Sequence, residues 1–162
     1  MQLLLPNDVV RKMRRHMVRA ARREIGGMIM GEEIGDQQFR IVDFSVDARS
    51  GTSAQFLRDA DQHDEALSAF FDSTGADYRR FNYLGEWHTH PSFDVHPSLQ
   101  DVRSMQDLVD DSGGVDFAVL FIARLRWCWR FECGAHLFVR DHAAMVVDVV
   151  HERRSSMIAG KV

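Results

Sequence analysis

Apolar residues recur at intervals of three or four positions after Asn7, and this spacing predicts a helix. Asn7 is a residue type that commonly caps helices, and the helix is expected to end near Arg23, before two glycines. The apolar positions are Val9, Val10, Met13, Met17, Ala20 and Ala21. The segment from Arg11 to Arg23 also carries six arginines and one lysine. These charges indicate either a solvated helix face or a surface that steers an acidic partner.

Apolar runs bounded by glycines and polar turns predict the strands of the chain. The predicted strands cover residues 26–34, 38–47, 81–90, 116–125 and 126–139, with a turn at Gly35–Asp36 and a short last element at 145–150. Two further helices are predicted, one at 59–71 and one that begins at Ser98, a natural N-cap. The pattern favours one α/β domain at residues 1–150, with a mixed sheet flanked by helices, and a tail at 151–162.

The composition is that of a single globular domain, since 45% of the 162 residues are hydrophobic and 27% are charged. No run approaches the roughly 20 apolar residues that span a bilayer. The apolar run before Pro6 is too short for the apolar core of a secretory signal. We therefore expect a cytoplasmic protein without a membrane partner. A net charge of −4 argues against a general nucleic-acid binder. Cys128 and Cys133 lie in an apolar, aromatic stretch and are expected to be ordinary buried thiols, with no disulfide framework.

The stretch GEWHTHPSFDVHPSLQD, residues 85–101, contains a candidate metal site. Side chains at positions i and i+2 of a strand point to the same face, so His88 and His90 are expected to project together. A proline ends this strand, and the chain returns to a helix on which Asp101 lies three residues after Ser98. Asp101 would supply a third ligand, a carboxylate oxygen, and Ser98 would lie just outside the metal shell.

Two histidines and one aspartate leave one position of a tetrahedral zinc site open for water, which is typical of catalytic rather than structural sites. Zinc lowers the pKa of a bound water towards about 7, and a nearby carboxylate would take the proton of that water. A His-x-His pair on a strand is often two ordinary polar surface residues. The metal hypothesis therefore depends on Asp101 and on the spacing between the histidines and the helix.

These residues resemble the signature of the JAMM family, the JAB1/MPN/Mov34 (MPN+) zinc metalloproteases. The family pattern is H-[ST]-H-P, about six residues and S-x-x-D, which here reads HTHP, SFDVHP and SLQD from His88 to Asp101. An upstream glutamate lies in E-x-x-G-x-[LIM]-x-G, and EIGGMIMG from Glu24 to Gly31 has that form. The resemblance covers most of residues 1–150 and implies the MPN/JAB (cytidine deaminase-like) fold, with a curved, mostly antiparallel sheet.

The resemblance also implies roles for individual residues. His88, His90 and Asp101 would bind one Zn²⁺ per chain, together with a catalytic water. Glu24 would act as the base that deprotonates the water and later protonates the departing amine. Ser98 would help to hold the oxyanion that develops on the scissile carbonyl.

Members of the family cleave isopeptide or peptide bonds after the C-terminal glycine of ubiquitin or ubiquitin-like proteins. The chain is similar to stand-alone prokaryotic members, which are associated with ubiquitin-like conjugation, antiphage defence and partners that resemble E1 and E2 enzymes. The implied function is a cytoplasmic, deubiquitinase-like zinc isopeptidase or peptidase, for deconjugation or precursor processing. Its substrate would be an extended tail ending in glycine, and residues around 50–80 are expected to form one wall of the channel for that tail.

Other residues compete for the role of the base. Glu86 shares a face with His88 by alternation, and it is the main rival or an outer partner of the metal. Glu32 and Glu33 are expected at the solvent end of their strand. His96 is interpreted as loop surface or a substrate contact.

Other functions also remain as alternatives. The runner-up is a peptidase that acts on sulfur-carrier protein adducts, and a non-catalytic MPN scaffold is the alternative from another class. A nucleobase deaminase would need a P-C-x-x-C pair, which the two cysteines do not form. The net charge of −4 gives no nucleic-acid footprint for a RadC-like relative.

Overall fold

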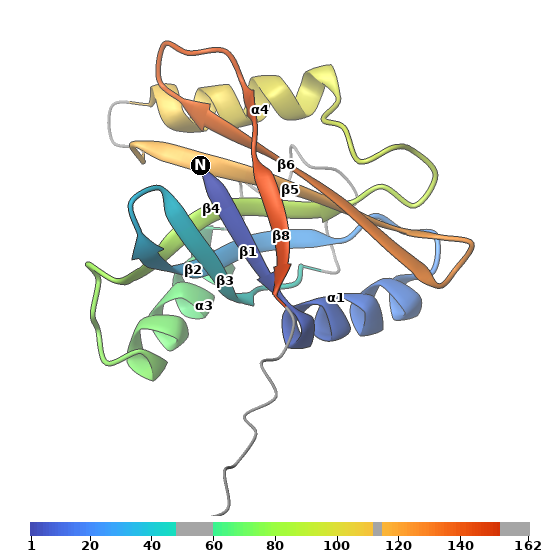
Figure 1. Cartoon of the computed structure of the whole chain (residues 1–162), viewed down its shortest axis with the longest axis horizontal. Helices are drawn as coiled ribbons and strands as arrows, with labels where there is room; N and C mark the ends of the chain where they lie inside the picture. Colours follow the sequence, from blue (N-terminus) through green and yellow to red (C-terminus); the bar gives the residue numbers. More distant parts are fainter. Residues whose placement is uncertain (48–59, 112–114, 153–162) are drawn as a thin grey trace, which may run out of the picture.

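One sheet organises the part of the chain that the computed structural model describes, residues 1–47, 60–111 and 115–152. Its strands follow the order β7-β6-β5-β4-β2-β3-β1-β8 (Figure 1). Most neighbouring strands are antiparallel, and the parallel pairs are β1–β3, β1–β8 and β4–β5. The strands are β1 (Gln2–Pro6), β2 (Gly26–Gly35), β3 (Gln38–Phe44), β4 (Phe81–Thr89), β5 (Phe117–Arg126), β6 (Arg130–Val139), β7 (Met145–Val146) and β8 (Asp148–Glu152).

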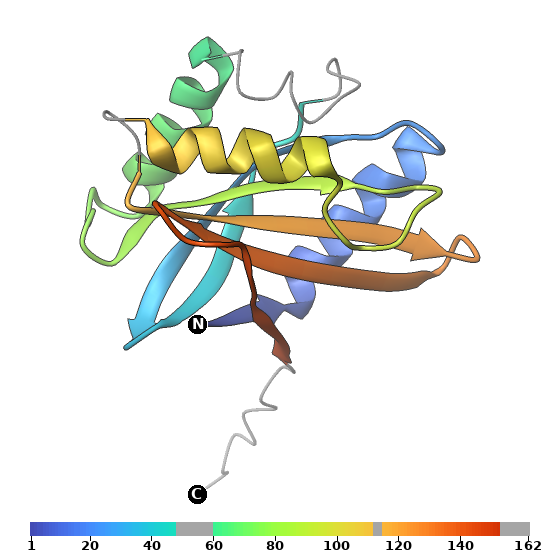
Figure 2. The ribbon, with the colours of Figure 1, turned by 90° about the horizontal axis from the view of Figure 1, so that it is seen from above.

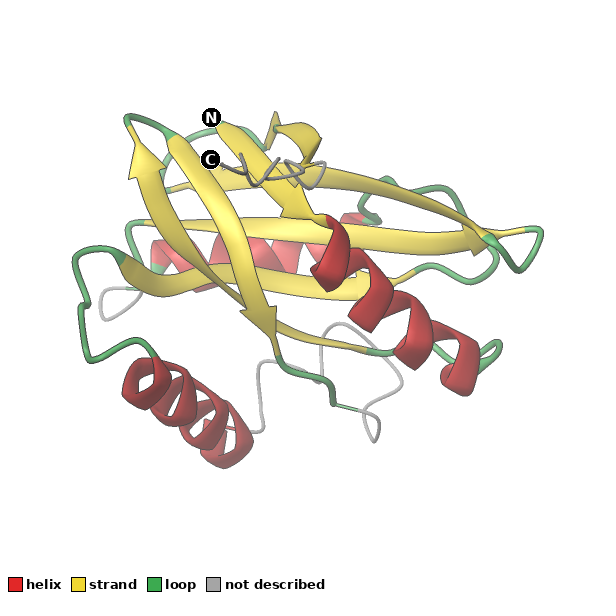
Figure 3. Ribbon diagram, turned by 60° about the horizontal axis from the view of Figure 1, so that its bottom comes forward, coloured by secondary structure: helices red, strands yellow, loops and turns green. Residues whose placement is uncertain are grey.

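Helices α1 (Asn7–Ala20), α3 (Ala60–Ser73) and α4 (Leu99–Asp110) flank the sheet. Figure 3 shows α1 in front of the sheet and α4 behind it, and Figure 2 shows α4 running along the strands. In β5, Val119, Phe121 and Ala123 belong to the core cluster of α1, whereas the alternate residues pack with Met105 and Val109 of α4. Burial on both faces explains why the sequence of β5 is continuously apolar. The predicted fold class is confirmed.

Helix α1 begins and ends differently from the prediction. Its N-cap is Pro6, which is extended and makes no side-chain cap, so Asn7 is the first helical residue. The fixed φ of proline suits the passage from β1 into the helix. The helix ends at Ala20 because Ala21 adopts a positive φ of 56°, from which its N–H bonds back to the carbonyl of Met17. The two arginines that follow therefore lie outside the helix.

Sequence patterns do not predict β1, and they predict only a short element where β7 and β8 lie. Leu3 and Leu5 of β1 are fully buried, and β1 pairs with β3 on one side and β8 on the other (Figure 1). Strand β8 runs to Glu152, two residues into the predicted tail, and residues 153–162 lie outside the described residues. A five-residue strand gives little periodic signal, and the β1–β8 partners Gln2 and Asp148 are 146 positions apart.

The strand predicted at 126–139 begins only at Arg130, because the three residues before it form the β5–β6 hairpin turn. Trp127 and Cys128 occupy this turn with positive φ values of 53° and 63°. The expectation that both cysteines are buried is therefore wrong for Cys128, which the turn exposes to solvent. Cys133 is partly buried, and burial raises the pKa of its thiol to about 11. Neither cysteine is in a disulfide.

The helix predicted at 59–71 is α3, which extends to Ser73. The channel wall expected at residues 50–80 falls partly on residues 48–59, which lie outside the described residues. In the described part of the chain, no helix combines the length and the apolar character needed to cross a bilayer.

Candidate metal centre

Strand β4 brings two imidazoles to one face of the sheet at its carboxyl end. His88 and His90 are buried, with exposed fractions of 4% and 8%. Trp87 points to the opposite face, where it packs edge-on against Phe44 and donates from Nε1 to the Ser45 carbonyl at 2.8 Å. The alternation predicted from the HTHP sequence is therefore confirmed.

Helix α4 supplies the carboxylate through the geometry of its first turn. The Asp101 N–H donates to Ser98 Oγ at 3.1 Å, and the Ser98 N–H donates to Asp101 Oδ2 at 2.7 Å. This reciprocal capping box confirms Ser98 as the N-cap and fixes the side chain of Asp101. Asp101 is only 3% exposed, because it faces the two histidines rather than solvent.

The three ligand atoms converge on one point. Nε2 of His88 lies 3.0 Å from Nε2 of His90, and Asp101 Oδ2 lies 3.7 Å and 3.8 Å from these two atoms. The centre of the circle through the three atoms is about 2.0 Å from each, which matches Zn–N and Zn–O bonds of about 2.0–2.2 Å. His88, His90 and Asp101 thus form a group that fits a metal ion, and no other such group occurs within residues 1–47, 60–111 and 115–152.

The hydrogen bond of His90 and the burial of His88 suit metal binding. A carbonyl oxygen only accepts hydrogen bonds, so the 2.7 Å contact of His90 Nδ1 with the Asp94 carbonyl places a proton on Nδ1. This leaves Nε2 as the ring nitrogen that can offer a lone pair to a metal. Burial lowers the pKa of His88 to about 4, although the charge of Asp101 opposes this effect. His88 is therefore neutral near pH 7, as a metal ligand must be.

The loop between the histidines and α4 is anchored on β5 and β6. Arg124 donates from Nη1 to the Phe93 carbonyl at 3.0 Å, and the same nitrogen lies 2.6 Å from the carboxylate of Asp94. Gly134 lies under this loop, where an added Cβ would come within 2.6 Å of a loop carbonyl oxygen. These contacts hold the Asp94 carbonyl in the position from which it orients His90.

Glu24 precedes β2 at the same end of the sheet. Ile25, the residue after Glu24, makes two hydrogen bonds with Thr89. The Thr89 N–H donates to the Ile25 carbonyl at 2.8 Å, and Thr89 Oγ1 accepts the Ile25 N–H at 3.0 Å. Gly26 pairs with His88, and continuing this register by two residues beyond the start of β2 leads to Glu24 opposite His90. Both the place of the Glu24 carboxylate at the metal centre and its role as the base stay predictions.

Ser98 has a structural role as the N-cap of α4. Its Oγ accepts the Asp101 N–H, which leaves the hydroxyl hydrogen available to donate elsewhere. The residue is exposed, so a substrate can reach this hydroxyl. Its contact with an oxyanion stays a prediction.

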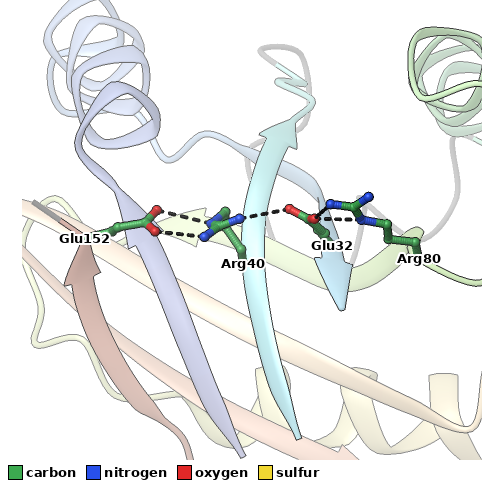
Figure 4. A network of polar contacts seen from close by, with 4 residues as sticks. All are labelled: Glu32, Arg40, Arg80 and Glu152. Atoms are coloured by element: carbon green, nitrogen blue, oxygen red, sulfur yellow. Dashed lines mark hydrogen bonds and ion pairs between the residues drawn. The ribbon is translucent and has the colours of Figure 1, made fainter. Parts of the chain in front are cut away.

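Glu32 lies near the end of β2 that is far from the metal centre, but it is buried. The expectation that Glu32 lies at the solvent end of its strand is therefore wrong. It is 7% exposed and pairs with Arg40 at 3.0 Å and with Arg80, while Arg40 also pairs with Glu152 at 2.9 Å (Figure 4). Burial alone would raise the pKa of Glu32, but the hydrogen bonds from the two arginines bring it below its usual value. Glu32 is six residues beyond Gly26, or about 20 Å along the strand, which excludes it as the base. Glu33 is exposed at the same distant end, as predicted.

Glu86 does share the face of His88, as alternation predicts. It is 7% exposed and pairs in the sheet with Met28 on one side and Leu120 on the other, and burial raises its pKa to about 7. Burial and the charge of Glu86 also raise the pKa of Tyr83 well above its usual value. The sequence reveals which face Glu86 occupies, but its burial depends on neighbouring strands that lie far away in the chain.

Comparisons with known proteins agree with this architecture. Residues 6–135 match the sequence model of prokaryotic homologues of the JAB domain. A solution structure from Desulfitobacterium hafniense aligns with a TM-score of 0.69 at 16% identity, covering 94% of each chain. One from Salinibacter ruber aligns with a TM-score of 0.57 at 17% identity, covering 96% of this chain and 94% of the other.

A JAB1/MPN domain protein from Archaeoglobus fulgidus gives a TM-score of 0.47 at 12% identity, covering 92% of this chain and 98% of the other. The comparison with curated proteins finds no match.

The burial of Glu86 predicts an unusual pH dependence for the metal-free protein. Its folded pKa of about 7 lies above the ordinary 4.5, so between these values the folded chain keeps a proton that the unfolded chain loses, and stability falls as pH rises. We expect wild type to lose about 3 kcal/mol relative to Glu86→Gln between pH 4.5 and 7. Denaturant unfolding of both proteins in the presence of chelator measures this difference.

The comparison with Glu86→Gln is needed because His88 acts in the opposite direction. Its pKa of about 4 lies below the ordinary 6.5, so it contributes stability that increases as pH rises between these values. His88 is present in both proteins and cancels in the difference. Parallel stability curves for the two proteins would contradict the prediction.

The two hydrogen bonds between Thr89 and Ile25 predict different effects for two substitutions of Thr89. Thr89→Val keeps the shape of the side chain but leaves the buried Ile25 N–H without its acceptor, which is expected to cost about 1–3 kcal/mol of stability. Thr89→Ser retains the hydroxyl and serves as the control. Amide hydrogen exchange at Ile25 should accelerate in Thr89→Val well beyond Thr89→Ser, and equal exchange in both variants would show that the hydroxyl does not hold this strand.

Proposed function

Because the chain belongs to the family of prokaryotic JAB domain proteins, we propose that it is a zinc-dependent peptidase. The proposed reaction is cleavage after the C-terminal glycine of a ubiquitin-like protein or of its conjugates. The observation that supports it most strongly is the convergence of two imidazoles and one carboxylate on a point at zinc-ligand distance from all three. This donor set contains no thiolate and has three members, which favours a catalytic site over a structural one.

In this proposal each residue has a defined task. His88, His90 and Asp101 hold the zinc, which when bound acidifies water and polarises a carbonyl group. Glu24 accepts a proton from the attacking water and gives it to the departing amine, so that one carboxylate acts in both halves of the reaction. Ser98 donates its free hydroxyl hydrogen to the oxygen on which negative charge develops.

The cellular setting belongs to the same proposal. Proteins that resemble E1 and E2 enzymes would build the conjugates in the cytoplasm, and this chain would release or process the ubiquitin-like protein. The extended tail of such a protein would reach the metal centre with its small terminal glycine foremost.

Replacement of the proposed base gives the central prediction. Glu24→Gln should retain one zinc per chain and lose about 10²–10⁴-fold in the rate of cleavage, because the amide cannot take the proton. Glu33→Gln is the matched control on the same segment, since Glu33 is exposed at the far end of β2, and it should keep full activity. The substrates are ubiquitin-like proteins joined through their terminal glycine to a folded reporter, with mass spectrometry of the products.

Metal analysis separates the remaining alternatives. His88→Ala should lose the zinc, whereas His96→Ala, an exposed imidazole in the adjacent loop, should keep it. A wild-type chain that holds no zinc after reconstitution would favour a non-catalytic scaffold. A zinc-loaded chain that releases only sulfur-carrier adducts would transfer the activity to that class of substrate.

A further inference from the structure

A groove lies on the side of the sheet that faces α1. It encloses about 670 Å³ between the end of α1, the residues around His90 and the β5–β6 turn. We call it the hairpin groove and define it by Val18, Ala21, Arg22, Thr89, Pro91 and Trp127. Thr89 and Pro91 are the chain neighbours of His90, so this groove reaches the strand end that carries the metal ligands, on the opposite face of the sheet, and no metal ligand lines it.

The surface around the hairpin groove is strongly basic. Val18 also lines a second hollow of about 420 Å³, whose other walls are Arg11, Arg14, Arg15 and Arg19. Within the described part of the chain, no acidic residue lines either hollow. Arg19 and Arg22 form no ion pair there, and Arg14 bonds only to a backbone carbonyl, that of Trp129, at 2.8 Å. Among the described residues that line the two hollows, arginines thus outnumber carboxylates, although the net charge of the chain is −4.

The hairpin turn adds two aromatic rings to this basic surface. Trp127 and Trp129 are 61% and 63% exposed, and their ring centroids are 6.4 Å apart. The guanidinium of Arg126 stacks over the Trp127 ring at 4.5 Å. A bulky residue rarely adopts the positive φ of Trp127, for which asparagine or glycine is the usual choice. Exposed tryptophan and arginine side chains are the residue types most enriched at the energetic centres of protein interfaces.

We propose that the hairpin groove binds an acidic segment of the protein substrate. An apolar side chain of that segment packs against Trp127, and its carboxylates face Arg22 and the arginines of α1. The inference rests on the proposed peptidase function, because the occupant of the groove is a segment of the protein substrate of that reaction, and Thr89 and Pro91 join the groove to the strand end that carries the metal ligands. Charge complementarity selects an acidic segment over a neutral or basic one.

Direct binding to the zinc-loaded full chain tests this inference without requiring cleavage. The probe is a fluorescein-labelled dodecapeptide of Asp, Glu and Leu, and its counterpart carries Asn and Gln at the acidic positions. We expect the acidic peptide to bind about tenfold more tightly at low salt, with the preference shrinking as ionic strength rises. Fluorescence anisotropy measures both affinities.

Three variants localise the binding. Arg22→Glu should weaken binding of the acidic peptide about tenfold. Arg79→Glu makes the same charge change at an exposed site just before β4, at the opposite end of that strand from Thr89, and should leave the affinity within about twofold. Trp127→Asn removes the ring while suiting the positive φ of the turn, so a folded variant with weaker binding is expected.

The outcomes separate this inference from the proposed function. A chain that binds the acidic peptide but cleaves no substrate would refute the peptidase and leave the groove as an acidic-segment site. Equal affinity for the two peptides, or equal effects of Arg22→Glu and Arg79→Glu, would overturn the groove assignment whatever the activity. Tighter binding to vesicles of phosphatidylcholine and phosphatidylserine, or to a single-stranded oligonucleotide, would also overturn it and assign the surface to a membrane or a nucleic acid.

Discussion

His88, His90 and Asp101 are buried side by side, and burial of polar groups costs free energy unless each finds a partner. The surrounding structure supplies those partners one by one. The Asp94 carbonyl accepts from His90, and the Ser98 N–H donates to Asp101. The loop and the capped helix are therefore shaped by the need to satisfy this group. A metal ion would complete the compensation, because the two Nε2 atoms, 3.0 Å apart, and the Asp101 carboxylate would then share it as their partner.

The local part of the site is predictable from the sequence because its geometry follows from short-range rules. A pleat places His88 and His90 on one face whatever the rest of the fold, and a capping box joins Ser98 to Asp101 within a single turn. The non-local part is different. The burial of Glu86 depends on Met28 and Leu120, which come from separate strands, and Glu32 is buried only because Arg40 and Arg80 reach it.

The sequence pattern also does not predict strand β1 or the turn between β5 and β6, because contacts distant in sequence and the turn geometry determine them. Strand β1 is too short to show a period, and its burial arises from β3 and β8 on either side. At the turn, the apolar character of Trp127 and Cys128 indicates a buried strand, whereas their backbone adopts the left-handed conformation that exposes them. The apolar character of these two side chains favours burial, but the geometry of the turn exposes them to solvent.

The pairing of β1 with β8 has a consequence for synthesis on the ribosome. Strand β1 acquires its second neighbour only when residues 148–152 have been translated, whereas the last metal ligand, Asp101, emerges earlier than these residues. The nascent chain can thus assemble β2, β3, β4 and their hydrogen bonds while one edge of β1 is still open. An open edge invites pairing with other chains, so translation of residues 148–152 covers this edge of β1 and leaves the five-residue β8 as the edge of the sheet.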